Sequence, residues 1–140
     1  MLKTTSQLLS QHQTIEEKQA ETYSVLAERH PKYADLFNGL AKDNLRHRDM
    51  AQRAYREGVT DAFEVGFLVD PLNPDDYAVV VPEGGWSEAV ETMIRNEETV
   101  IRFCLDAASN SSNLLPDVPE TFERLAKRKR RNIDKLKEIA

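Results

Sequence analysis

The chain has 140 residues, of which 31% are charged and 40% hydrophobic, and its formal net charge is −5 at pH 7. This length suits one domain with a substantial core, and the few glycines and prolines favour helices. The negative charge argues against nucleic acid or anionic lipid as a partner. The longest strongly apolar run, near Tyr77 to Val81, is far shorter than the roughly 20 residues of a membrane-spanning helix.

The cysteine content and the N-terminus indicate the compartment. Cys104 is the single cysteine, which excludes an internal disulfide and a Cys-x-x-Cys metal site. We interpret it as a small buried residue rather than a nucleophile. The first residues contain no apolar segment of the signal-peptide type. These features together predict a cytoplasmic protein.

Two amphipathic helices are predicted in the first half of the chain. Thr4 and Gln7 have the spacing of a capping box, which favours a helix over 5–29. Its inward positions repeat every seven residues, and Glu16 lies in the middle of that row. Pro31 suits the first turn of a second helix over 32–57. The short connection makes these helices antiparallel neighbours.

Residues 58–84 form a different kind of segment. Prolines and glycines interrupt the helical pattern, yet the segment contains too many apolar residues for a free linker. We expect a packed crossover with one short helix near Asp61–Phe67. Its apolar side chains would cover the bundle or form an interface with a partner protein.

Two further helices are predicted after the crossover, over 86–109 and 118–139. Each has an apolar row with a polar residue near its middle, as the first two helices do. The sequence therefore predicts one all-α domain over 1–140. Its expected fold is an antiparallel four-helix bundle with a long crossover between the second and third helices. The polar residues expected to meet in one layer of its core are Glu16, Asn44, His47, Asn96, Lys129 and Asn132.

This arrangement resembles the ferritin-like superfamily, most closely its rubrerythrin-like branch, over all four helices. The resemblance implies a di-iron site built from two helix pairs. The first helix of a pair offers Glu followed seven residues later by Tyr, and the second offers Leu-Ala and then Glu-x-x-His. Glu16 and Tyr23 match the first pattern, while Leu40, Ala41 and His47 match part of the second.

The metal-ligand positions implied by the resemblance are largely replaced. Glu16 and His47 alone retain the residue type that the family uses, so they are the weak candidates for metal ligands. Leu125 and Ala126 keep the framework in the fourth helix. The resemblance therefore implies a degenerate di-iron site. Its departures from the motif are Asn44 in the second helix, Asn96 and Phe103 in the third, and Lys129 and Asn132 in the fourth.

These replacements predict a layer that is balanced without metal. Buried carboxylates repel one another unless a cation neutralises them. Here Glu16 and Lys129 would neutralise each other, and the asparagines and His47 would hydrogen-bond around them. In the alternative, Lys129 extends its ammonium to water along its aliphatic stem.

Three functional hypotheses follow. The leading one is a non-catalytic binding or scaffold module without a cofactor, which forms a homodimer by analogy with the family. The second is a metal-binding oxidoreductase or iron-binding protein that holds iron or another divalent metal at Glu16 and His47, with His12 as a third ligand. The third is nucleic-acid binding through the basic run 127–131. We interpret this run as a solvated surface, because five successive helical residues point in all directions.

Overall fold

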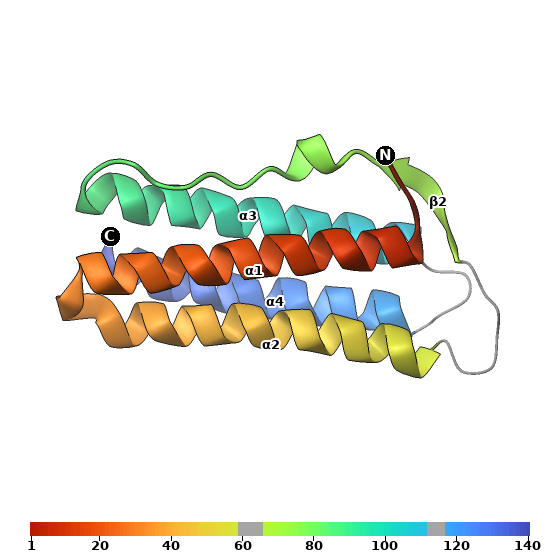
Figure 1. The fold of residues 1–140 in the computed structure, drawn as a ribbon, viewed down its shortest axis with the longest axis horizontal. Coiled ribbons are helices and arrows are strands. Elements are labelled where there is room, and N and C mark those ends of the chain that lie inside the picture. The colour runs from red at the N-terminus through yellow and green to blue at the C-terminus, as the bar shows by residue number, and fades with distance from the viewer. Residues whose placement is uncertain (59–65, 112–116) are drawn as a thin grey trace.

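The computed structural model describes residues 1–58, 66–111 and 117–140. Four long helices lie side by side and make up most of the chain (Figure 1). Within the described residues, no helix has both the length and the apolar character needed to cross a membrane. The elements in chain order are β1 (Leu2–Thr4), α1 (Thr5–Arg29), a 3₁₀ helix (Pro31–Tyr33), α2 (Ala34–Gly58), β2 (Phe67–Leu72), a second 3₁₀ helix (Pro74–Tyr77), α3 (Trp86–Asn110) and α4 (Asp117–Ile139).

The helices agree closely with the predicted ranges, and the start of α1 shows why. The Thr4 hydroxyl accepts a hydrogen bond from the Gln7 backbone N–H at 3.1 Å, and the Gln7 side chain accepts one from the Thr4 N–H at 3.2 Å. This reciprocal capping box satisfies two backbone donors that a helix start leaves free. The second helix begins slightly later than expected, because Pro31–Tyr33 forms a 3₁₀ turn first.

Two short strands are the main departure from the all-α expectation. β1 pairs with β2 in an antiparallel ladder that places Leu2 opposite Leu72 and Thr4 opposite Phe67. The first residues of the chain are thus attached to the crossover (Figure 1). Of the short helix expected near 61–67, residues 61–65 lie outside the described residues, and Phe67 belongs to β2.

The crossover runs back along α3 and sets the topology. Its Tyr77 hydroxyl donates a 2.6 Å hydrogen bond to Asp106 of α3, and Lys18 of α1 donates to the carbonyl of Val79 at 3.1 Å. Because this segment returns the chain along the length of the helices, α2 and α3 run in the same direction (Figure 1).

The interior consists of two apolar clusters separated by a polar layer. One cluster lies towards the start of α1 and includes Leu8, Phe103 and Phe122. The other lies towards the end of α1 and includes Phe37 and Met93. All four helices contribute buried polar side chains between the two clusters. The polar layer in the middle of the bundle is therefore the candidate functional site of the interior.

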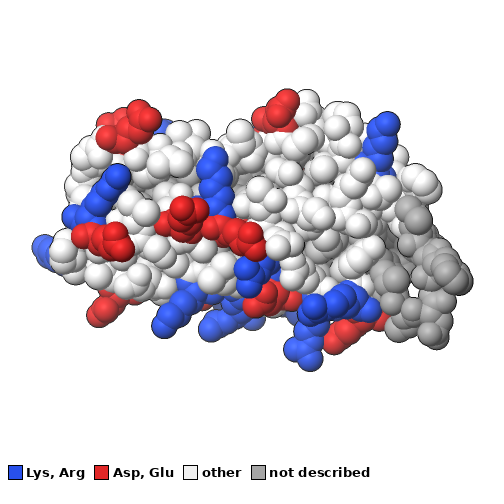
Figure 2. All heavy atoms as spheres, viewed as in Figure 1, with Lys and Arg blue, Asp and Glu red and all other residues white. Residues whose placement is uncertain are grey.

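The surface has an uneven distribution of charge. On the face in Figure 2, Lys, Arg, Asp and Glu gather towards the edge formed by α2, and charges are sparse over much of the region crossed by the segment before α3. The crossover also carries solvent-exposed apolar side chains, among them Phe67 at 69% and Val80 at 61% exposure.

Candidate functional site

Glu16 is the centre of the polar layer and is fully buried. One of its carboxylate oxygens, Oε1, accepts hydrogen bonds from the Lys129 ammonium at 2.6 Å and from the Asn44 amide at 2.8 Å. The other, Oε2, lies 2.8 Å from Nε2 of His12 and 3.9 Å from Nδ1 of His47. Three helices thus supply partners to one carboxylate, as the sequence analysis anticipated for Asn44, His47 and Lys129.

Helix geometry explains how these side chains converge. His12 and Glu16 are four residues apart on α1, so they lie on one face a single turn apart. Asn44 and His47 are three apart on α2 and share a face in the same way. Both faces also carry the buried apolar residues of their helices, which turns them to the core.

The Glu16–Lys129 pair is an ion pair in the interior of the protein. Burial alone would raise the pKa of Glu16, but Lys129 and then His12 outweigh it and hold that pKa well below its usual range. Burial alone would lower the pKa of Lys129, and the Glu16 carboxylate reverses that direction. Lys129 is 0% exposed, so the alternative in which its ammonium reaches water is wrong.

Glu97 is a second buried carboxyl in this layer, and the pattern of the sequence did not indicate it. It is 0% exposed, and its Oε1 accepts a 2.8 Å hydrogen bond from the Tyr23 hydroxyl. Burial raises its pKa, although Lys129 opposes this effect. Glu97 directly follows Asn96 in the sequence, and no spacing distinguishes the two neighbours as candidates for the layer. The buried face of α3 is wide enough to include Glu97 beside Asn96.

Asn96 differs from the expectation that it faces the other layer residues. It is buried, but its Oδ1 accepts from the Val80 N–H at 3.0 Å and its Nδ2 donates to the Val80 carbonyl at 2.8 Å. Nδ2 also lies 3.4 Å from the side-chain oxygen of Gln19. The Asn96 amide therefore binds the backbone of the crossover. Glu97 is the residue of α3 that lies in the polar layer, where Asn96 was expected.

His47 and Asn132 form the edge of the layer between α2 and α4. They are 2% and 3% exposed, and both line a small pocket on that side of the bundle. Burial, followed by the positive charge of Lys129, lowers the pKa of His47 to about 3. His47 is therefore a neutral imidazole at neutral pH.

The family resemblance implies two iron ions at this layer, and the donor set does not fit them. The Lys129 ammonium bonds the Glu16 oxygen that a metal would need, and its charge repels any cation placed there. Across the described ranges, no group of three or more His, Cys, Asp or Glu side chains is arranged to hold a metal ion. The three-ligand alternative of His12, Glu16 and His47 is therefore not formed.

The remaining sequence candidates have structural roles. Cys104 is fully buried, and burial raises the pKa of its thiol, so it is a poor nucleophile. His30 packs edge-on against Trp86 at 4.9 Å between ring centroids. Of the basic run 127–131, Lys129 points inward and its neighbours outward or to the sides, as the helical pattern predicted.

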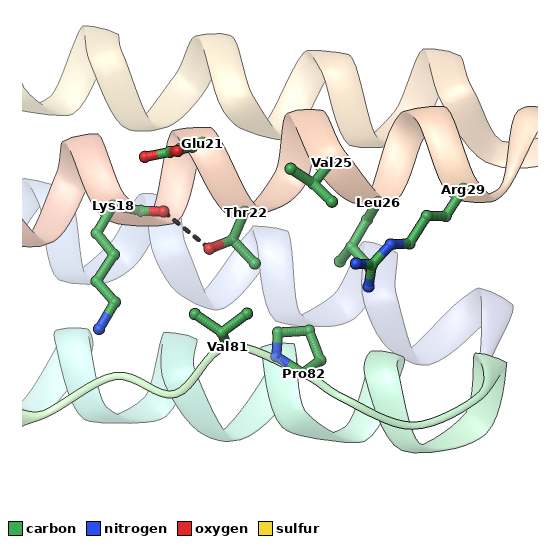
Figure 3. Close-up of a pocket in the computed structure, with 8 residues that line it drawn as sticks. All are labelled: Lys18, Glu21, Thr22, Val25, Leu26, Arg29, Val81 and Pro82. Atoms are coloured by element: carbon green, nitrogen blue, oxygen red, sulfur yellow. Dashed lines mark hydrogen bonds between the residues drawn. The ribbon is translucent and has the colours of Figure 1, made fainter.

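A separate pocket lies between α1 and the crossover (Figure 3). It has a volume of about 200 Å³, and its walls include Leu26 of α1 and Val81 and Pro82 of the crossover. Lys18 and Arg29 stand at its two ends in Figure 3. Lys18 is held by the carbonyl of Val79, so this pocket mainly offers apolar wall.

Comparison with known proteins adds no relative. No family model, no curated protein and no solved structure matches this chain. The residues of the polar layer are therefore the basis for assigning a function.

Proposed function

We propose that this chain is a non-catalytic ferritin-like bundle of the rubrerythrin-like kind, in which an ion pair has replaced the metal. It acts as a binding or scaffold module, with no cofactor and no catalytic centre. The observation that carries the proposal is the 2.6 Å bond from the Lys129 ammonium to Glu16, with both side chains fully buried.

The balance of charge in the layer supports the proposal. A buried carboxylate needs a positive partner, and in the resembled family iron supplies it. Here Lys129 supplies it, while Asn44 and His12 satisfy other lone pairs of the same carboxylate. A carboxylate whose charge and hydrogen bonds are already satisfied gains little from binding a metal. The layer then stabilises the fold, and the binding function is located at the surface of the protein.

Metal analysis of protein purified without chelator tests the proposal. We expect iron, manganese and zinc each at well under one equivalent, with no change in His47→Ala. The matched control is His30→Ala, which removes a histidine from the aromatic cluster at Trp86. Stoichiometric metal that is lost in His47→Ala and kept in His30→Ala would overturn the proposal.

That outcome would favour the second candidate, a metal-binding oxidoreductase or iron-binding protein. The observation on its side is that His12 and His47 both lie within 4 Å of Glu16. In that case a metal would have to displace Lys129 from Glu16, so binding should break the ion pair. The Lys129 ammonium would then lose a proton or become exposed to solvent.

The proposal also includes a cytoplasmic location and a homodimer. A single buried cysteine suits a reducing compartment. The dimer contact would use the exposed apolar side chains of β2 and the crossover, where Phe67, Val69 and Val81 are each more than half exposed.

A further inference from the structure

We propose that the pocket between α2 and α4 binds a small phosphate-type oxyanion. This inference rests on the proposed binding role and names a ligand class for it. The pocket has a volume of about 140 Å³, and its walls are Asp43, His47, Arg128, Arg131, Asn132 and Lys135. At ~30 Å³ for each liquid water, this is the space of about five waters, which suits an ion of five non-hydrogen atoms such as phosphate.

The wall of the pocket is rich in positive charge. Arg128, Arg131 and Lys135 are spaced by three and four residues on α4, so they share one face of that helix. Among the described residues, none of these three cations forms an ion pair. Asp43 is the single acid in the wall, and it faces Arg46 at 3.6 Å. Three cations along one side of a pocket attract an anion, and arginine matches a phosphate oxygen pair in a bidentate manner.

The floor of the pocket contains a buried hydrogen-bond donor without a partner among the described residues. Asn132 is 97% buried and its Nδ2 has no hydrogen-bond partner within the described part of the chain. A buried amide donor without an acceptor costs free energy, and an oxyanion supplies acceptors. His47 lines the same pocket, with its Nδ1 3.9 Å from the Glu16 carboxylate. The floor thus combines the unused amide donor of Asn132 with the cationic wall.

The placement of the cations distinguishes this pocket from a nucleic-acid surface. Arg130 belongs to the same basic run but takes no part in the wall. The cations that do take part line one side of a recess rather than a flat stripe. The geometry favours a compact anion over a polymer backbone, which needs positive charge along an extended surface.

Calorimetric titration of the full chain with inorganic phosphate at low ionic strength tests the inference. We expect one binding site, with an affinity reduced roughly tenfold in Arg131→Gln because one charge-assisted contact is lost. Arg130→Gln is the matched control, since it removes the same charge from the next residue and should bind as the unmodified chain does. Absence of phosphate binding, or equal weakening by both variants, overturns the inference.

Two further measurements keep the outcomes distinct. Asn132→Leu should weaken phosphate binding while raising the thermal midpoint of unfolding, because it removes a buried donor that has no partner in the described ranges. A raised midpoint shows that the weaker binding is not caused by unfolding.

Titration with phenyl phosphate distinguishes a free phosphate ion from a phosphomonoester group as the ligand. Tighter binding of phenyl phosphate than of inorganic phosphate indicates a phosphate group carried on a larger molecule. A short DNA duplex that binds more tightly than either, with Arg130→Gln weakening it equally, contradicts the pocket. Metal measured on the same samples tests the proposed function separately, so either can fail alone.

Discussion

At the scale of single residues, the stability of the polar layer depends on Glu16. Its carboxylate takes one ammonium, one amide and one imidazole as partners, from three different helices. Such a pair contributes little beyond an apolar pair of the same shape, but breaking it leaves a stranded charge.

Single and double substitutions at this pair should therefore differ sharply. Glu16→Ala strands the Lys129 ammonium and should lower the free energy of unfolding by ~3–5 kcal/mol. Glu16→Leu combined with Lys129→Met removes both charges and should cost much less. Urea unfolding measures both values. Equal losses for the single and the double variants would mean that the two groups do not stabilise each other.

The pH dependence of stability should report His47. Its pKa is about 3 in the folded protein and 6.5 in an unperturbed chain, so the unfolded state binds more protons between those values. The free energy of unfolding should accordingly fall as pH drops from 6.5 towards 3, by roughly 1.4 kcal/mol per unit from this group. The raised pKa of Glu97 acts with the opposite sign, since its contribution is lost as pH rises.

The difference between the unmodified chain and His47→Gln isolates that histidine, because Glu97 is present in both. Urea unfolding at pH 5 and pH 7 should give a smaller change in the variant. The same change in the free energy of unfolding in both proteins would mean that the pKa of His47 is not lowered in the folded protein.

The residues of this site were only partly predictable from sequence. Lys129 and Asn44 stood out because each interrupts an apolar row at mid-helix, where a polar side chain must find a partner. Glu97 did not, because the adjacent Asn96 satisfied the same pattern and periodicity cannot separate two neighbours on a wide buried face. The role of Asn96 needed the path of the crossover, which no local pattern encodes.

At the scale of elements, the crossover is a packed part of the structure. Asn96 clamps it by exchanging two hydrogen bonds with the backbone of Val80, much as a neighbouring strand would. Helix boundaries followed from caps and prolines in the sequence. The pairing of β1 with β2 did not, because it joins residues more than sixty positions apart and each strand is too short for a periodic signal.

Removing the clamp should loosen the crossover locally. Asn96→Ala deletes both bonds to Val80, so the Val80 amide should exchange its hydrogen faster and the protein should lose ~1–3 kcal/mol of stability. Asn38→Ala, on the exposed face of α2, is the control and should change neither quantity. Unchanged exchange at Val80 in Asn96→Ala would show that other contacts hold the segment.

At the scale of the whole molecule, charged side chains gather towards the edge formed by α2 on the face in Figure 2, and the crossover carries exposed apolar side chains. β2 has β1 as its neighbour on one side, and Phe67 and Val69 stand exposed along it. A strand of this kind is a ready surface for a second copy of the chain.

Light scattering on the eluting protein should therefore give the mass of a dimer. Phe67→Ser removes the most exposed aromatic ring of the patch and should shift the protein towards monomer. Leu45→Ser, which truncates an exposed side chain on α2, should leave the dimer intact. A monomeric unmodified chain, or equal effects of both variants, would remove this part of the proposal.

The Glu16–Lys129 bond joins positions 113 residues apart in the chain. On the ribosome, α1 and α2 are therefore complete long before the lysine that neutralises their glutamate has been synthesised. Until then, burying that side chain would require it to take up a proton. The hairpin of α1 and α2 is therefore expected to stay open in the nascent chain until α4 supplies Lys129 and completes the interior.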